Sequence, residues 1–514
     1  MEQQEKERKN PFAFAQKDAK LTDLKFDTKP VGYFKDAWLR FKKSKAAVVG
    51  AVIIILIVLY AIFTPVFSSH SSGENGDGNY KLMVPYNEPL SHINIADGTY
   101  SKKCNPKAYL SLSAISIGYE DHDGSSISLE KGQASQFNVF KSVSEPYTSS
   151  GTVYRDCKVQ AYYEKGFVYM DGITEDAFNA MVDWQTKNNA QIIYPMVDDT
   201  LLEISSQASN ANIFFQTKSG YPIDQNGAKI TELAKLGEMK DAYLRDSSGT
   251  VQFWEAKASN QRYIRVWYWN YYRYMNNGAI PNYLLGTDDL GRDIAVRLAS
   301  GIGLSLLLGV STFIVNFTIG AIYGAIEGYY GGVTDLIMER ISDILADIPF
   351  IVLASIVNIQ LISTNKMSPF GAIVFAFVLT GWIGPAYRLR TQFYRFKNQE
   401  YVLAARTLGA SDARIMWKHI FPNTLGTIIT ASVLTIPGTI FTESMLSYLN
   451  IINLNQGSIT SLGTILATGQ QYMTTYPHII VPPCIIISLL MISFNLFGNG
   501  LRDAFNPSLR GAEE

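Results

Sequence analysis

The chain is divided into long apolar stretches and one long polar stretch. Residues 46–67 contain no charged side chain, and this length suffices to cross about 30 Å of hydrocarbon as a helix. A polar block follows at residues 68–284, and the apolar stretches return after Gly301. We predict five further membrane helices there, at residues 305–326, 345–362, 371–386, 427–449 and 479–496.

Basic residues orient these helices. They cluster before the first predicted helix and between the fourth and fifth, so both regions are expected on the cytoplasmic side. The residues are Lys35, Arg40, Lys42, Lys43 and Lys45 in the first cluster, and Arg388, Arg390, Arg395, Lys397, Arg406, Arg414 and Lys418 in the second. Six crossings then place both termini in the cytoplasm and the polar block outside the cell. Because residues 1–45 precede the first helix and it lacks a small-residue cleavage site, we interpret it as a retained membrane helix.

The polar block has the patterns of a folded domain that contains both strands and helices. It opens with a stretch at residues 68–79 whose composition is typical of a flexible linker. Strand-like alternation recurs at residues 136–143, 152–163, 166–170 and 261–269. Residues 174–188 predict an amphipathic helix that Thr174 caps, with Phe178, Met181, Val182 and Trp184 facing inward. We therefore expect an inserted α+β domain.

Two features of the polar block allow more than one interpretation. One is an aromatic run that fits an interfacial belt, a stacking surface for a peptide or partner protein, or a buried strand edge. It consists of Trp267, Tyr268, Trp269, Tyr271, Tyr272 and Tyr274. The other is the pair Cys104 and Cys157, which fits a disulfide, if the block lies outside the cell, or two free thiols.

The sequence has no signature of catalysis or of a metal site. His70, His92 and His122 lack the spacing of metal ligands, and neither HExxH nor GxSxG occurs. The phosphate-binding pattern GxxxxGK[ST] is also missing, so any ATP hydrolysis has to be done by separate subunits. With a net charge of −1, the composition does not favour nucleic acid as a partner.

Residues 400–423, EYVLAARTLGASDARIMWKHIFPN, are the most informative segment. Ala404 and Ala405 favour a slim helix, Gly409 permits a sharp turn, and the hydroxyl of Ser411 can cap a second helix. We predict two short helices at nearly a right angle, which dock on the cytoplasmic side into a groove of another protein. The candidate docking residues are Glu400, Ala404, Ala405, Arg406, Gly409, Ala410, Ser411 and Arg414.

Two further candidate sites are expected near the outer membrane surface. Residues 285–293, LGTDDLGRD, predict a short amphipathic helix capped by Thr287 or Asp288, which acts as a gate or brace or is only a helix start with surface ion pairs. Its charged residues are Asp288, Asp289, Arg292 and Asp293, with Arg297 within reach. Glu443 is costly in a membrane unless it is paired or hydrated, so it lines the transport route, latches a gate or forms a structural hydrogen bond.

Four segments carry a resemblance to a known family. They are FKKSKAAVVG before the first membrane helix, LGTDDLGRD, residues 400–423, and the stretch from SLGTILATGQ to FNLFGNGLRDAFNPSLR. They resemble the oligopeptide/dipeptide branch of ABC importer permeases, the OppC/DppC-type subunit, over residues 35–67 and 285–510. The resemblance implies an all-α membrane fold of six helices, the MetI-like type I importer fold, into which the polar block is inserted.

The sequence departs from the family pattern at four positions. Leu403 stands where the general importer motif has glutamate, a change that this branch tolerates, and Glu400 lies one turn earlier. Phe421 replaces a usual leucine. Asn450 and Asn499 stand where the family usually has glycine and aspartate, which puts only local loop details in doubt.

The resemblance implies a non-catalytic permease subunit of an ATP-driven oligopeptide importer in the bacterial cytoplasmic membrane. The implied partners are a second homologous permease, two ABC ATPase subunits that bind ATP and Mg²⁺, an extracellular peptide-binding protein and membrane lipid. No cofactor is expected on this chain itself. Residues 400–423 would be the coupling segment that receives the motion of the ATPases.

The expected units are a cytoplasmic segment at 1–45, the first membrane helix at 46–67, the polar block at 68–284, a five-helix core at 285–506 with its coupling loop at 388–426, and a tail at 507–514. One alternative is a permease of the same branch for dipeptides, nickel chelates or glycosides. Another is a membrane-anchored receptor that acts through the polar block.

Overall fold

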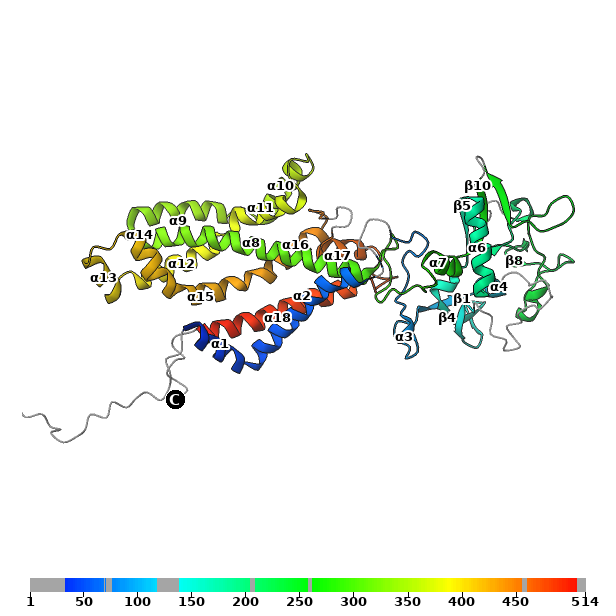
Figure 1. The fold of residues 1–514 in the computed structure, drawn as a ribbon, viewed down its shortest axis with the longest axis horizontal. Coiled ribbons are helices and arrows are strands. Elements are labelled where there is room, and N and C mark those ends of the chain that lie inside the picture. The colour runs from blue at the N-terminus through cyan, green and yellow to red at the C-terminus, as the bar shows by residue number, and fades with distance from the viewer. Residues whose placement is uncertain are drawn as a thin grey trace, which may run out of the picture.

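The computed structural model describes residues 33–68, 70, 76–117, 138–203, 209–257, 261–454 and 460–505. The molecule is elongated, with a helical bundle at one end and the polar block, which contains both strands and helices, at the other (Figure 1). His122, half of the predicted linker and the C-terminal tail lie outside the described residues.

Five helical segments in the described part of the chain are long and apolar enough to cross a membrane. They are α2 (Lys45–Phe67), α8 (Ile294–Tyr330), α11 with α12 (Pro369–Gly381 and Ile383–Phe396), α15 with α16 (Phe421–Val433 and Thr435–Tyr448), and α18 (Val481–Phe505). The predicted helices at 46–67, 305–326 and 371–386 fall within these segments, those at 427–449 and 479–496 overlap them to within two residues, and all five are confirmed as helical.

The prediction of one continuous membrane helix at residues 345–362 is wrong. That range joins the end of α9 (Gly332–Ala346) to α10 (Phe350–Val357) and to the π-helical turn Asn358–Ile362. The chain bends by 72° between α9 and α10. Proline disfavours helical geometry in the residue before it, so Pro349 separates the two helices. The bent pair adds a sixth crossing segment if it is counted as one span.

A short helix precedes the first membrane helix. In α1 (Tyr33–Lys43), Ala37 and Phe41 are buried in a cluster with Ala504 of α18, whereas Trp38 is exposed. Ser44 ends α1 and caps α2, because its side chain accepts from the backbone N–H of Ala47 at 3.4 Å. Helix α1 and the C-terminal end of α18 lie at the end of the bundle farthest from the polar block (Figure 1).

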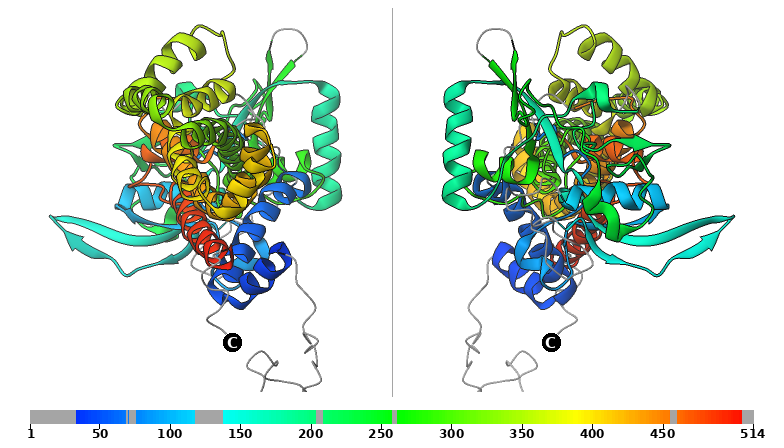
Figure 2. Two further views of the ribbon diagram at one scale, coloured as in Figure 1. Left: turned by 90° about the vertical axis from the view of Figure 1, so that its left-hand side faces the viewer. Right: turned by 90° about the vertical axis from the view of Figure 1, so that its right-hand side faces the viewer.

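In its described residues, the polar block contains two four-stranded antiparallel sheets and one two-stranded sheet. The first sheet consists of β1 (Thr99–Cys104), β4 (Thr152–Gln160), β2 (Phe140–Val143) and β3 (Tyr147–Ser149). The second consists of β5 (Phe167–Ile173), β10 (Gln261–Trp267), β6 (Ile193–Tyr194) and β9 (Trp254–Lys257). In the third, β7 (Thr217–Lys218) pairs with β8 (Tyr221–Pro222). The hairpin of β3 and β4 projects sideways from the molecule in the end-on views of Figure 2.

Five short helices accompany these strands: α3 (Glu88–Ser91), α4 (Pro106–Ile117), α5 (Ala161–Glu164), α6 (Glu175–Asn188) and α7 (Tyr268–Met275). Helix α6 confirms the predicted amphipathic helix. The Thr174 side chain accepts from the N–H of Ala177 at 3.3 Å, Met181 is buried, and Phe178, Val182 and Trp184 pack against the same apolar cluster. The helical spacing of apolar residues within this segment was therefore sufficient to predict both its type and its buried face.

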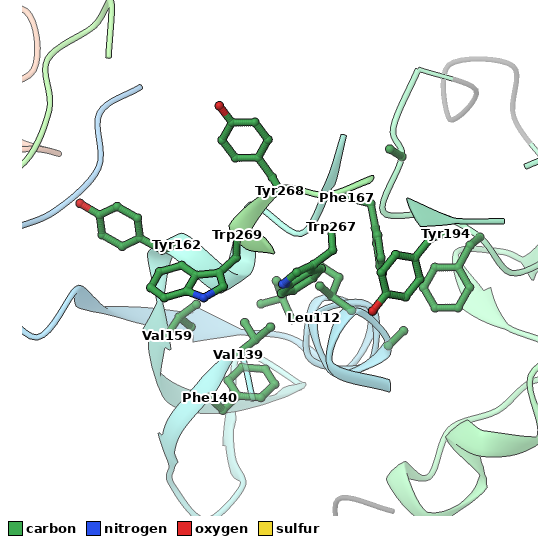
Figure 3. Close-up of a cluster of buried hydrophobic side chains, with 14 of the residues drawn as sticks. Leu112, Val139, Phe140, Val159, Tyr162, Phe167, Tyr194, Trp267, Tyr268 and Trp269 are labelled. Atoms are coloured by element: carbon green, nitrogen blue, oxygen red, sulfur yellow. The ribbon is translucent and has the colours of Figure 1, made fainter. Parts of the chain in front are cut away.

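The aromatic run forms part of the main core of the polar block. Trp267, Tyr268, Trp269 and Tyr272 are buried, and the rings of Trp267 and Phe167 meet edge to face with centroids 5.1 Å apart (Figure 3). The prediction of a strand through residue 269 is wrong, because β10 ends at Trp267 and α7 starts at the next residue. The buried interpretation holds for these four rings, although three of them lie on a helix.

The two ends of the polar block pair with each other where it meets the bundle. Tyr86 and Tyr283 exchange backbone hydrogen bonds of 2.9 and 2.8 Å, and the N–H of Asp77 donates to the carbonyl of Gly291 at 3.0 Å. Gly291 has a φ of +77° and packs against the backbone of Asp77, so a side chain there would collide. We call the paired segments 76–86 and 283–292 the base clasp. It attaches the polar block directly to the start of α8.

Candidate functional site

The coupling segment lies at the end of the bundle opposite the polar block (Figure 1). It contains α13 (Glu400–Thr407), a turn, α14 (Asp412–Arg414) and a π-helical stretch, Ile415–Ile420, that leads directly into α15. Gly409 has a φ of +81°, as the predicted sharp turn requires. The second helix is therefore the beginning of a membrane helix and not a separate short one.

The prediction that the Ser411 hydroxyl caps the second helix is wrong. Ser411 does occupy the N-cap position, but its side chain accepts no capping hydrogen bond. The backbone closes the turn instead, since the N–H groups of Gly409 and Ala410 donate to Arg406 and Ala405 at 3.0 and 3.1 Å. The hydroxyl of Ser411 is exposed and is left for other contacts.

Burial divides the predicted docking residues into two groups. Ala405 is only 8% exposed and lies beside the cluster formed by Val402, Ile415 and Ile420, so it packs within the chain. The exposed group is Glu400, Ala404, Arg406, Gly409, Ser411 and Arg414, and Ala410 is half-buried. Leu408 was not among the predicted docking residues, yet its side chain is 87% exposed beside the turn. A leucine directly before the turn glycine was the only signal for it.

Polar contacts hold the coupling segment against α8. The Arg406 guanidinium lies 3.4 Å from the Tyr329 hydroxyl, and that hydroxyl donates to Asp412 at 2.6 Å. Nearby, Arg390 of α12 donates to Asp335 at 2.6 and 3.0 Å and to Glu339 at 2.8 Å, which ties α12 to α9. From the sequence, Arg390 was interpreted only as one of the basic residues that mark the cytoplasmic side. Its acidic partners lie far away in the sequence and could not be assigned from it.

The LGTDDLGRD segment is a closed turn and not the predicted short helix. Thr287 and Asp293 form an isolated antiparallel bridge, and Gly286 and Gly291 both have positive φ, which interrupts a helix. Thr287 and Asp288 cap no helix. Asp293 caps α8 instead, by accepting from the N–H of Ala295 at 2.8 Å.

The ion pairs of this turn are buried, so the interpretation as surface ion pairs is wrong. Asp288 accepts from the Arg292 side chain at 2.8 Å and also pairs with Arg297. These three residues are 2%, 5% and 3% exposed. Asp289 is nearer the surface, 3.9 Å from Arg292. Removing one partner from this group of a buried acid and two buried arginines would leave a buried charge without compensation. The intact group therefore stabilises the turn in this arrangement.

Glu443 is completely buried within α16. It accepts hydrogen bonds from Ser461 at 2.6 Å, Ser447 at 3.0 Å and Ser305 at 3.2 Å. These donors come from α17 (Leu462–Gln470) at its cap, from α16 itself and from α8. The carboxylate therefore joins three helices. The expected structural hydrogen bond to a neighbouring helix is confirmed, whereas the roles in lining the transport route and in latching a gate remain predictions.

The polar block offers no site of its own for a metal in the part that the structure describes. No group of three or more His, Cys, Asp or Glu residues is placed to hold an ion there. Cys104 and Cys157 lie on the neighbouring strands β1 and β4 as buried free thiols, so the disulfide is not formed. Burial, together with Cys104, raises the pKa of Cys157 to about 12, which keeps that thiol protonated.

Comparisons with known proteins identify the family. Residues 316–511 match the model of a binding-protein-dependent transport system inner membrane component, and residues 32–88 match the N-terminal TM domain of oligopeptide transport permease C. The oligopeptide transport system permease protein OppC of Bacillus subtilis is 43% identical over 44% of this chain and 72% of its own length. The dipeptide permease DppC of the same organism is 40% identical over 44% of this chain and 68% of its own.

Among solved structures, an inward-facing MetNI methionine ABC transporter matches 41% of this chain and 96% of its own, at 18% identity and a TM-score of 0.32. That score is too low to support a conclusion alone. The two family models cover the N-terminal membrane helix and the chain from within α8 to its C-terminal part. The chain is therefore a multi-pass membrane protein that belongs to the oligopeptide/dipeptide family of ABC importer permeases.

Proposed function

We propose that the protein is the permease subunit of an ATP-driven peptide importer, that it forms half of the translocation pathway and that it catalyses no reaction itself. The exposed coupling segment, at the end of the bundle opposite the polar block, carries this proposal. The names of the relatives support peptides as cargo, because one is an oligopeptide and the other a dipeptide permease. Competition between long and short peptides for uptake measures which length this chain prefers.

The proposed topology has six crossings, with the bent pair of α9 and α10 as the third. Basic residues flank α2 and the coupling segment, so that end of the bundle is assigned to the cytoplasm. Both termini then lie in the cytoplasm, and the polar block lies outside as an inserted domain. The boundaries proposed for these units are those predicted from the sequence, at residues 45, 67, 284 and 506.

The proposed partners are a second permease subunit, two ATPase subunits that bind ATP and Mg²⁺, an extracellular peptide-binding protein and the surrounding lipid. The coupling segment supports the ATPase contact. Leu408 offers an apolar side chain with almost no cover from its own chain, flanked by the small Gly409 and the polar Ser411. An exposed leucine gains free energy when a partner's groove removes it from water, and the neighbouring glycine adds no side chain that would obstruct the contact. Asp288, Asp289, Arg292 and Asp293 are proposed as a brace at the outer end, with Glu443 beneath it.

The Leu408→Asp variant tests the coupling assignment. We expect peptide-dependent ATP hydrolysis and uptake by the reconstituted importer to fall at least about tenfold, because a carboxylate cannot be buried in an apolar docking pocket without loss of affinity. Leu201→Asp is the matched control, since Leu201 is also an exposed leucine but lies in the polar block. Unchanged coupling in Leu408→Asp, or an equal loss in Leu201→Asp, would contradict the assignment.

A further inference from the structure

The buried charges of the outer turn and the buried Glu443 belong to one hydrogen-bonded network. Arg297 pairs with Asp288 and donates to the Thr460 hydroxyl at 3.1 Å. The Thr460 and Thr464 hydroxyls are 2.7 Å apart. Thr464 in turn accepts from the backbone N–H of Ser461 at 2.9 Å. Ser461 then donates to Glu443. The network thus runs from the base clasp to the place where α17 packs between the membrane helices α8 and α16.

Helix α17 is the element that this network holds. Ser461 and Thr464 form its capping box, so the groups that start the helix also bind it to α16 and, through Thr460, to α8. The N–H of Leu462 donates to the Ser305 hydroxyl of α8 at 3.2 Å. Gly463 packs so closely on α16 that a Cβ there would lie 2.7 Å from both Ser444 and Ser447. Helix α17 therefore has no room to slide in this arrangement and can only separate.

The polar groups between α17 and its neighbours α8 and α16 favour separation of these helices. A carboxylate bound only by hydroxyl groups is a costly way to pack helices in a membrane, because apolar side chains of the same volume pack without that cost. Hydroxyl and carboxylate groups are, however, readily hydrated once helices part. An interface built from them can open to water at a small cost, whereas an apolar interface cannot.

We propose that Glu443, Ser461 and Arg297 form an outer latch, in which they are positioning residues that hold α17 against α8 and α16, and that each transport cycle has to release it. The latch begins at the base clasp, because the Thr287 hydroxyl accepts from the N–H of Met83 at 2.8 Å and Asp288 follows directly. A protein that moves the polar block therefore acts on the latch. This inference rests on the proposed transport function for its role in the cycle, but not for its structure.

Thiol labelling measures release of α17. Ile465 is 2% exposed and faces the bundle core, so an Ile465→Cys variant in a Cys484→Ser background reacts with a water-soluble maleimide only when α17 separates. In the full importer without ATP, we expect Ser461→Ala to raise the labelling rate about tenfold, since it removes the shortest hydrogen bond to the carboxylate. Glu443→Gln, which keeps the shape and the acceptor oxygen, should raise it less than Glu443→Leu.

Thr442→Ala is the matched control for labelling. Thr442 lies next to Glu443 on α16, but its hydroxyl donates to the carbonyl of Gly438 in its own helix at 2.9 Å. We expect its labelling rate to stay within about twofold of the parent. Equal rates in Ser461→Ala and the parent, or an equal rise in Thr442→Ala, would overturn the latch.

A tether tests whether release is needed for transport. A Cβ at Gly301 of α8 would lie 3.2 Å from the Cδ1 atom of Ile465, so cysteines at the two positions are near enough to be joined by a short bifunctional methanethiosulfonate reagent, which a reductant removes. We expect the cross-link to abolish ATP-driven uptake and a reductant to restore it. Normal uptake in the cross-linked protein would overturn the proposal. Absence of uptake in the reduced pair and in the parent would instead contradict the proposed function and leave the labelling result standing.

Discussion

Glycine at three positions lets the backbone of α8 contact that of α12. Gly320, Gly324 and Gly328 recur every four residues and so share one face of the helix. A Cβ at Gly320 would lie 2.6 Å from the carbonyl of Trp382, one at Gly324 would collide with the carbonyl of Ala386, and one at Gly328 would lie 2.7 Å from the carbonyl of Arg390. This stripe of small residues is the close-packing pattern of membrane helices.

Substitution of Gly324 tests this contact. We expect Gly324→Ala to destabilise the purified subunit by about 1–3 kcal/mol, because the new methyl group meets backbone atoms that cannot move aside. The measurement is thermal unfolding in detergent. Gly303→Ala on the same helix is the control, since a Cβ there meets nothing within 4 Å and alanine favours helix. Equal melting temperatures for the two variants would refute the close contact.

For single residues, burial was harder to predict from the sequence than membership of the docking segment. Ala405 and Leu408 stand three positions apart, yet the alanine is buried and the leucine exposed, the reverse of what their hydrophobicity suggests. The sequence indicated a docking segment from Gly409 and the alanines. It could not indicate which face the chain itself covers, because that depends on how α13 packs on the cluster of Val402 and Ile415.

At the scale of elements, the junction between the base clasp and the loop before α18 contains a histidine sensitive to pH. The ring of His478 packs against Gly286, where a Cβ would lie 2.8 Å from a ring carbon. Burial lowers the pKa of His478 to about 4 from its ordinary value of 6.5. Between these values the unfolded chain binds a proton that the folded junction excludes. The stability due to the neutral ring is complete above about pH 6.5 and declines as pH falls toward 4.

Acidification should therefore loosen this junction. From pH 7 to pH 5 we expect a loss of at most about 2 kcal/mol in the free energy of unfolding from this residue. Thermal unfolding at the two pH values measures it, with His478→Gln as the variant that cannot be protonated. The difference between the two pH values should be smaller in His478→Gln than in the unmodified protein. An equal difference in both would show that other groups cause the pH dependence.

At the scale of the whole molecule, the polar block and the bundle have separate cores. The main cluster of the block includes Trp267 and Phe167, whereas the bundle clusters are centred on residues such as Ile302, Leu308 and Phe393. The base clasp brings Tyr86 and Tyr283 into backbone contact, so the two ends of the block are adjacent. Adjacent ends allow an inserted unit to be removed without stretching the rest of the chain.

Removal of the block distinguishes a permease from a receptor. We expect a variant in which an Asn-Gly pair replaces residues 87–282 to insert into the membrane and to co-purify with the ATPase subunits, because two-residue Asn-Gly turns suit antiparallel pairs such as Tyr86 and Tyr283. The measurement is the amount of ATPase recovered per permease. If the shortened chain fails to assemble, while Leu201→Asp assembles normally, the block is required for the basic architecture and the receptor alternative gains support.

The sequence alone determined the features that depend on neighbouring residues. Apolar length predicted α2 and α18, the helical spacing of apolar residues predicted α6 with Met181 inward, and a glycine predicted the turn at Gly409. Charge placement and the family motifs indicated the class of protein. These properties are local, because a helix or turn is chosen by residues within a few positions of each other.

Only the tertiary structure decided what lies together across long separations. The third predicted membrane helix is bent at Pro349. The segment LGTDDLGRD, expected as a helix, is a turn whose Asp288 is buried between two arginines. That turn is also joined to Glu443 through Thr460 and Ser461. Such contacts depend on the packing of whole helices, and a pattern within one segment carries no information about which partner another segment brings.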